Sequence, residues 1–84
     1  MARRTIPPAA IEASALQASR CMIARGDRPA YRLRMDQDGR WTLSEAPWLS
    51  LDATDRRGAL ANAIQAISAW LDCEPAAFDV AVYG

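Results

Sequence analysis

The stretch that most restricts the possible folds of this chain is residues 31–44, YRLRMDQDGRWTLS, where apolar and polar side chains alternate around an Asp-Gly turn. Alternation with a period of two is typical of strands that are buried on one face. A two-residue turn would pair apolar with polar positions. A three-residue loop instead pairs Met35 with Trp41 and Leu33 with Leu43, and it puts the turn glycine at the left-handed position before a G1 bulge. The sequence therefore predicts a bulged antiparallel hairpin with Trp41 on the core side.

Helical patterns flank this hairpin. Residues 7–26 begin with two prolines and end with a glycine, which suits a helix entry and exit. Its apolar stripe is predicted at Ile11, Ala15, Ala18 and Met22, widened by Leu16 and Ile23. Residues 52–72 carry the stronger pattern, with a predicted seam of Leu60, Ile64, Ile67 and Leu71. Ala63 and Trp70 lie beside that seam, and Asn62, Gln65, Ser68 and Asp72 are predicted to face solvent.

The ends of the second helix and the remaining segments complete the predicted order α-β-β-(β)-α-β. Thr54 or Asp52 is expected to cap the helix, with Asp55 in its first turn. Residues 46–51 are expected to form a short or irregular strand, because Pro47 favours an edge or a bend. Residues 76–83 are expected to close the chain as a strand.

The predicted fold class is α+β, with a small antiparallel sheet of three to four strands and two helices packed on one face. A chain of 84 residues predicts a single domain, 1–84, in which residues 1–6 are expected to be flexible. The core is predicted at Leu33, Trp41, Ile64, Ile67, Leu71 and Val80.

The composition argues against catalysis. The chain has no histidine, which removes the commonest general base and the commonest transition-metal ligand. Cys21 and Cys73 therefore lack a partner base and are expected to be buried or half-buried. The glycines are isolated, so no phosphate-binding loop is predicted. Turn and capping roles account for most of the carboxylates near the hairpin. We expect no enzymatic activity, no cofactor and no metal site.

Charge is balanced overall but unevenly placed. All ten basic residues are arginines, and ten acidic residues offset them. Residues 1–42 hold eight arginines and four acids, a net +4, whereas residues 43–84 hold two arginines and six acids, a net −4. No signal peptide and no apolar run near the ~20 residues that span a bilayer is present. With two reduced cysteines, a cytoplasmic protein without a membrane partner is expected.

Five residues are candidates for binding. Arg32 and Arg34 share one face of a predicted strand, where they either contact phosphates or form a solvated face. Trp48 follows a proline at the hairpin exit, and it is either an interface anchor or a core residue, with partial burial expected. Arg56 and Arg57 open the second helix.

Residues 31–72 resemble the HicB-like antitoxin domain. The matching parts are the strand YRLRM, the turn and aromatic strand DGRW, the exit SEAPWL and the helix ALANAIQAISAWLD of residues 59–72. The family's Pro-Gly element is replaced by APWLSL. The resemblance implies a domain that binds and masks a small toxin. We therefore expect a small non-catalytic domain whose partner is another protein.

Two alternative functions remain open. The order α-β-β-β-α with TDRRGALANA opening the last helix also resembles a double-stranded-RNA-binding domain, in which Arg56 and Arg57 would contact phosphates. A nucleic-acid partner is less expected, since such domains usually carry a basic excess. The third option is a small phage or prophage inhibitor of a larger complex. A homodimer is compatible with each of these functions.

Overall fold

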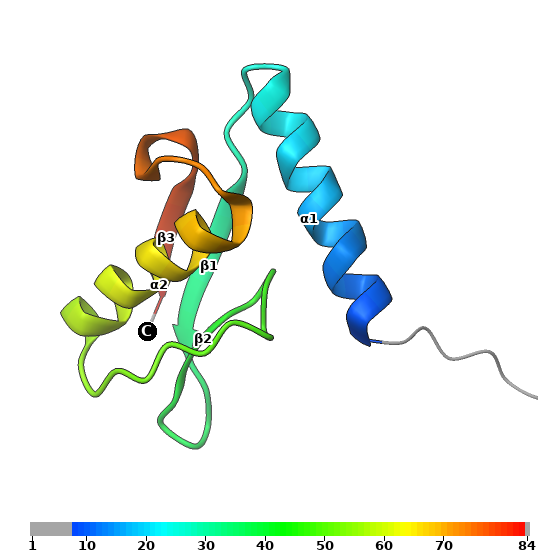
Figure 1. Ribbon diagram of the computed structural model, residues 1–84. Helices are drawn as coiled ribbons and strands as arrows, with labels where there is room; N and C mark the ends of the chain where they lie inside the picture. Colours follow the sequence, from blue (N-terminus) through cyan, green and yellow to red (C-terminus); the bar gives the residue numbers. More distant parts are fainter. Residues whose placement is uncertain (1–7, 84) are drawn as a thin grey trace, which may run out of the picture.

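The structure is a computed structural model that describes residues 8–83, so the predicted flexible start, residues 1–6, lies outside the described residues. The α+β class and the order of elements are confirmed (Figure 1). The elements are α1 (Pro8–Ala24), β1 (Ala30–Met35), β2 (Trp41–Leu43), α2 (Arg56–Leu71), a short 3-10 helix η1 (Pro75–Ala77) and β3 (Asp79–Tyr83). Among the described residues, no helix has both the length and the apolar character that crossing a bilayer requires.

The predicted hairpin is confirmed in its register and its turn. Leu33 pairs with Leu43 and Met35 with Trp41. Gly39 has a φ of 79°, the left-handed conformation that the bulged loop requires. The Asp36 carboxylate fixes the loop by accepting the backbone N–H groups of residues 38 and 40, each at 2.9 Å. Side-chain alternation and turn chemistry favour the same register, so the pairing of the two strands could be predicted from the sequence alone.

The sheet has the strand order β2-β1-β3 and is mixed. β1 and β2 are antiparallel, but β3 runs parallel to β1, with Tyr31 opposite Val80 and Leu33 opposite Val82. The expectation of a purely antiparallel sheet is corrected by this arrangement. α2 carries the chain back across the sheet, so β3 starts at the same end as β1, as in other helical crossovers. The expected short or irregular strand at residues 46–51 is not formed, because this segment consists of turns and bends, so the described residues contribute three strands to the sheet.

The buried stripe of α2 is turned by about one residue from the predicted seam. Ile67 and Leu71 are buried as predicted, whereas Leu60 and Ile64 are half-buried. The remaining buried positions of α2 are two alanines, Ala59 and Ala63. Small side chains let a helix approach a sheet closely, so the alanines face the sheet and the longer residues lie at its flank. The helical periodicity favoured the larger apolar residues as core positions, and it did not predict that the two alanines face the sheet.

Two polar residues of α2 that were predicted to face solvent are partly buried. The side-chain amide of Asn62 donates a hydrogen bond to the backbone oxygen of Leu51 at 2.6 Å. The hydroxyl of Ser68 donates one to the backbone oxygen of Cys73, also at 2.6 Å. Both side chains therefore satisfy backbone oxygens that lie outside α2. Asn62 in particular fixes the segment that follows the hairpin.

The N-cap of α2 is Asp55, not Thr54 or Asp52. The Asp55 carboxylate accepts the backbone N–H of Gly58 at 2.7 Å. The chain enters the helix later than predicted, which moves Asp55 from the first turn to the cap. A carboxylate at this position satisfies an N–H that the helix leaves unpaired and complements the helix dipole.

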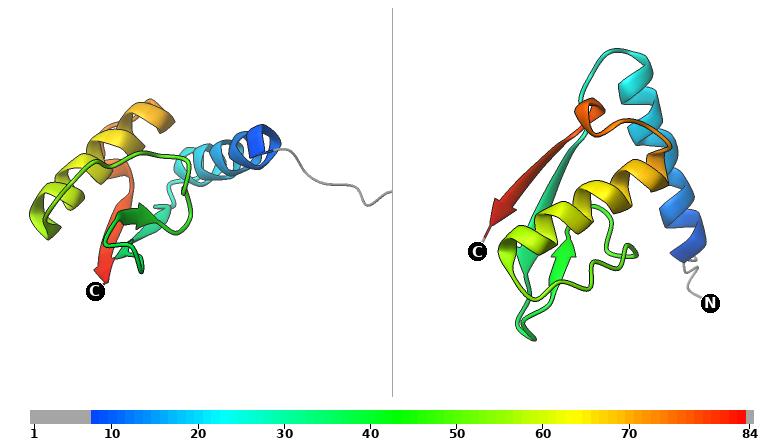
Figure 2. Two further views of the ribbon diagram at one scale, coloured as in Figure 1. Left: turned by 90° about the horizontal axis from the view of Figure 1, so that it is seen from below. Right: turned by 60° about the vertical axis from the view of Figure 1, so that its left-hand side comes forward.

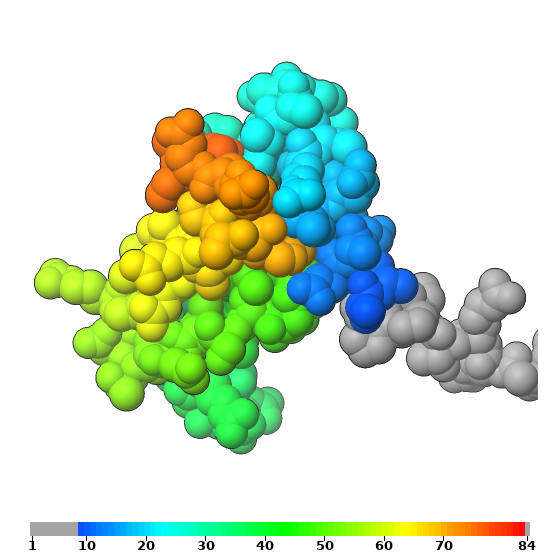
Figure 3. All heavy atoms as spheres, in the orientation of Figure 1, coloured from blue at the N-terminus to red at the C-terminus, as the bar shows by residue number. Residues whose placement is uncertain are grey.

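α1 lies beside the C-terminal half of α2 rather than over the centre of the sheet (Figures 1 and 2). Figure 3 shows the side chains of the two helices meeting there. Ser19 is buried on the inward face of α1, with Leu16 and Ile23 packed against the core. Ile11, predicted to belong to the apolar stripe, is 48% exposed, and Ala18 is also exposed. The stripe is again turned by about one residue.

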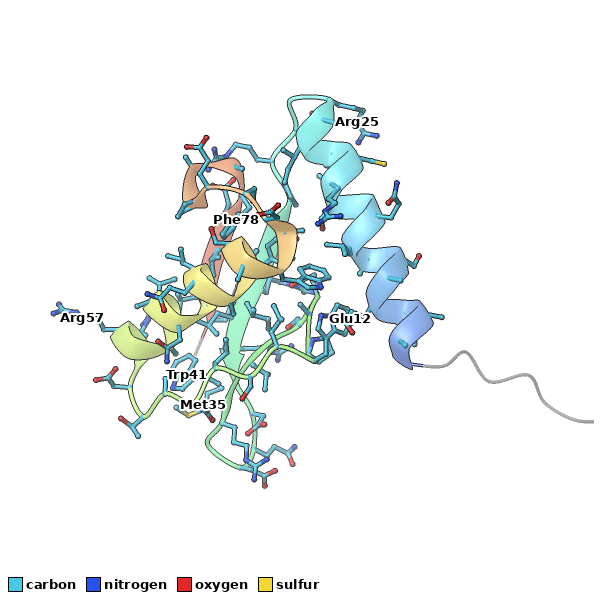
Figure 4. The ribbon with its side chains drawn as sticks, viewed as in Figure 1. Glu12, Arg25, Met35, Trp41, Arg57 and Phe78 are labelled. Atoms are coloured by element: carbon cyan, nitrogen blue, oxygen red, sulfur yellow. The ribbon has the colours of Figure 1, made fainter. Side chains whose placement is uncertain are left out.

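The core of the domain lies between α2 and one face of the sheet. Of the six predicted core residues, Leu33, Trp41, Ile67 and Leu71 are buried, and Ile64 and Val80 are half-buried. Phe78 and Met35 lie at opposite ends of the sheet in Figure 4. Phe78 is buried, whereas Met35 is 47% exposed.

Candidate functional site: the free edges and open face of the sheet

One face of the sheet is not covered by a helix within the described residues (Figure 2). Strand alternation assigns its side chains: Arg32, Arg34, Thr42, Asp79, Ala81 and Tyr83. Nearly all of them are exposed, and Tyr83 is 53% exposed. Sheets made only of parallel strands usually have both faces covered, whereas antiparallel sheets tolerate one wet face. This mixed sheet exposes its parallel pair, which makes the open face a candidate surface for a partner.

Arg32, one of the five candidate residues, is held by Glu45. The Glu45 carboxylate accepts the side-chain Nε of Arg32 at 2.7 Å and its backbone N–H at 2.7 Å. Burial acts to raise the pKa of Glu45, but the hydrogen bonds and the charge of Arg32 outweigh it, so the pKa is lowered. The charge of Arg32 is thus neutralised by Glu45. The same carboxylate accepts the backbone N–H of Arg32, which has no strand partner because β2 ends there.

Arg34, the second candidate on this face, forms no ion pair with the residues that the structure describes. In register, it lies between Thr42 on β2 and Tyr83 on β3. Its guanidinium group is exposed. Arg34 is therefore the cation of the open face that is available to a partner.

The outer edge of β2 presents backbone groups that no strand of the described residues pairs with. Ser44 donates its N–H to the backbone oxygen of Arg32 at 2.9 Å, so the even-numbered residues of this ladder face β1. By alternation, the N–H and C=O of Trp41 and the N–H of Leu43 point away from the sheet. Free edge groups of this kind can pair with an added strand.

A groove of about 780 Å³ runs between this edge and residues 47–54. Its walls include Arg40, Trp41 and Thr42 from the hairpin, and Trp48 and Asp52 from the opposite segment. The indole N–H groups of Trp41 and Trp48 are both buried, and neither has an acceptor among the described residues. Buried donors normally have a partner, so two unpaired ones beside one groove are unusual.

Trp48 is half-buried, which confirms the expected partial burial. Its ring centroid lies 5.5 Å from that of Trp70 on α2, with the ring planes at 57°. The indole is therefore placed between the core and the groove. One part packs against the core, and another lines the groove.

Arg56 and Arg57 occupy the first turn of α2 and are exposed. Arg57 points away from the body of the protein in Figure 4. These two arginines belong to the helix layer, whereas Arg32 and Arg34 lie on the opposite face of the sheet. The structure does not bring the four arginines together into one stripe.

Sequence reasoning missed Arg28, which fastens the start of β3. Its guanidinium group donates to Asp79 through Nη2 at 2.6 Å and Nε at 3.1 Å, and it also donates to the backbone oxygens of Ala76 and Phe78. The hydrogen bond from Arg28 is the main cause that lowers the pKa of Asp79. The two residues are 51 positions apart, and no local pattern connects them.

The cysteines and acidic side chains of the described residues are scattered over the fold. No group of three or more His, Cys, Asp or Glu that could hold a metal ion occurs between residues 8 and 83. Cys73 is half-buried as expected, but the expectation is wrong for Cys21, which is exposed on α1. Burial, followed by the nearby charges of Asp72 and Glu74, raises the pKa of the Cys73 thiol. Asp36 and Asp55 are engaged in the turn and the helix cap.

Comparison with known proteins gives no match. No protein-family model, no curated protein and no solved structure matches this chain. The resemblances to HicB-like antitoxins and to double-stranded-RNA-binding domains therefore stay predictions.

Proposed function

We propose that this protein is a small non-catalytic protein-binding domain whose site is the groove beside β2. The observation that carries the proposal is the combination of a strand edge that no described residue pairs with and an adjacent groove whose walls include Trp41 and Trp48. The groove volume of about 780 Å³ lies in the range of ~300–1,000 Å³ that ligand sites occupy.

An extended segment of a partner protein fits these groups best. Such a segment presents N–H and C=O groups at the spacing of a strand, so it can pair with Trp41 and Leu43 at the free edge. Trp48 supplies an aromatic wall, and tryptophan is enriched among the residues that dominate binding energy.

Positive charge beside the groove favours an acidic residue in that segment. Arg40 lines the groove, and Arg34 is in register with Thr42, another lining residue. Neither arginine is in an ion pair among the described residues. The resemblance to HicB-like antitoxins supports a small toxin as the partner. Arg56 and Arg57 lie on α2, whereas Arg32 and Arg34 lie on the open face of the sheet, and this division favours a protein partner over a continuous arginine surface for duplex RNA.

Capture from the native cell extract with the tagged protein tests the proposal. We expect Trp48→Ala and Arg40→Glu each to reduce the amount of a specific captured protein, whereas Arg20→Glu on the exposed side of α1 should not. Arg40 is exposed, so its replacement should leave the fold intact, which separates loss of binding from loss of stability. Unchanged capture by both groove variants would contradict the proposal.

Gel shifts with duplex RNA at low salt test the competing function. We expect no retarded band. A band that disappears steeply as salt is raised would instead show phosphate binding by the arginines.

A further inference from the structure

Among residues 8–83, no strand pairs with the outer edge of β3, which lies on the opposite side of the sheet from the groove. Asp79 donates its backbone N–H to the oxygen of Pro29 at 2.9 Å, so the odd-numbered residues of β3 face β1. By alternation, the N–H and C=O groups of Val80 and Val82 point outward. β3 has no proline and only one charged side chain, Asp79, so it lacks the usual features that prevent edge pairing.

An apolar strip accompanies this edge. Val80 and Val82 are half-buried on the helix side of β3. One flank of α2 faces the segment after the hairpin, as the bond from Asn62 to that segment shows. Leu60 and Ile64, on the other flank, lie toward β3 and are also half-buried. Backbone groups and apolar side chains are thus left incompletely covered along the same edge.

We propose that the protein forms a homodimer in which β3 pairs antiparallel with β3 of a second copy. A two-fold axis at Ala81 places Val80 opposite Val82 of the second copy, and Val82 opposite its Val80. All four residues point their backbone groups outward, so this register forms four hydrogen bonds without disturbing β1. Shifting one strand by one residue would place each outward-pointing N–H and C=O group opposite a residue whose own backbone groups point toward β1. The hydrogen bonds between the two β3 strands would then be lost.

Charge complementarity supports a second copy as the occupant. The two-fold axis sets the α2 helices antiparallel, so the arginine-bearing start of one approaches the acidic end of the other. Arg57, which projects outward beyond the body in Figure 4, then lies near Glu74 of the second copy. On the open face, the hydroxyl of Tyr83 meets the carboxylate of Asp79 from the second copy. The uneven charge of the sequence is balanced between the two chains.

The dimer goes beyond the proposed function because it uses the other edge of the sheet. Its sheet has six strands in the order β2-β1-β3-β3-β1-β2, with both free β2 edges at the outside. The two grooves stay open at opposite ends. A dimer of this kind binds two partner segments at once.

Register-specific crosslinking tests the pairing, in a protein whose Cys21 and Cys73 are both replaced by serine. Ala81 meets itself at the axis in a non-hydrogen-bonded pair, where Cα atoms are about 4.5 Å apart and suit a disulfide. The two copies of Tyr83 are about 13 Å apart along the strands. We expect mild oxidation to link Ala81→Cys into a covalent dimer and to leave Tyr83→Cys unlinked. Equal crosslinking of both variants would overturn the proposed register.

Light scattering during size exclusion measures the assembly itself. We expect the mass of two chains at micromolar concentration and a shift toward one chain for Ala81→Glu, which opposes two carboxylates at the axis. A charge reversal gives an independent check. Arg57→Glu should raise the dimer dissociation constant by roughly two- to fivefold, and adding Glu74→Arg should restore it. A single-chain mass for the unaltered protein would refute the dimer.

Discussion

The hydroxyl groups of Ser19 and Tyr31 lie 2.7 Å apart in a buried hydrogen bond that joins α1 to β1. Tyr31 is 3% exposed, and its ring meets that of Phe78 edge-on at a centroid distance of 6.0 Å. Burial raises the pKa of the Tyr31 phenol, although the bond to Ser19 acts in the opposite direction. This contact is the polar link that positions α1, whose remaining packing is apolar and partial.

Replacing Ser19 by alanine should destabilise the protein. The change removes few atoms but leaves the Tyr31 hydroxyl buried without a partner, which costs about 1–3 kcal/mol. For a domain of this size, each kcal/mol lowers the melting temperature by roughly 4–8 °C. Thermal unfolding followed by circular dichroism measures the shift. Tyr31→Phe in the same background should recover part of the loss, and no difference between Ser19→Ala and the parent would contradict the structural role.

Glu45→Gln should lower stability near neutral pH but not in acid. Gln keeps an acceptor for the Arg32 N–H while it removes the charge. The pKa of Glu45 is lowered in the folded state, so its contribution is complete above the ordinary value of 4.5 and is lost as the pH falls through the folded pKa. Urea unfolding at a series of pH values should show the two proteins converging at low pH. A constant difference across the series would rule out the charge as the cause.

Two isoleucines of α2 should differ in their contribution to stability. Ile67 is fully buried beneath the helix, and Ile67→Ala should cost about 2–5 kcal/mol. Ile64 is half-buried at the flank, so Ile64→Ala should cost clearly less. Denaturant unfolding of both variants gives the comparison. An equal or reversed order would mean that the buried stripe is the one that periodicity predicted.

The two cysteines should react at different rates with an alkylating reagent. Cys21 is exposed on α1, whereas Cys73 is half-buried and its pKa is raised, which lowers the fraction of reactive thiolate. Mass spectrometry during iodoacetamide labelling should find Cys21 modified first. Unfolding the protein in urea should remove most of the difference. Faster labelling of Cys73 in the folded protein would contradict its placement at the end of α2.

Local rules were sufficient for the hairpin, the end of α1 and the existence of α2. Alternation and a glycine in the left-handed conformation together determined the pairing of Met35 with Trp41. Gly26, with a φ of 87°, ends α1 through the 3.0 Å bond from its N–H to the oxygen of Ile23. These features depend on residues that are close in sequence, so their physical causes are visible in the sequence itself.

Only the tertiary structure decided which residues face the core and where a partner could bind. Close packing of Ala59 and Ala63 against the sheet turned the stripe of α2, because a helix settles where its smallest side chains permit the nearest approach. The Arg28–Asp79 pair joins residues 51 positions apart, and the parallel placement of β3 depends on the path of α2 across the sheet. The groove arises from the turn-rich segment facing β2. Sequence period describes one element at a time, whereas these features come from the contacts between elements.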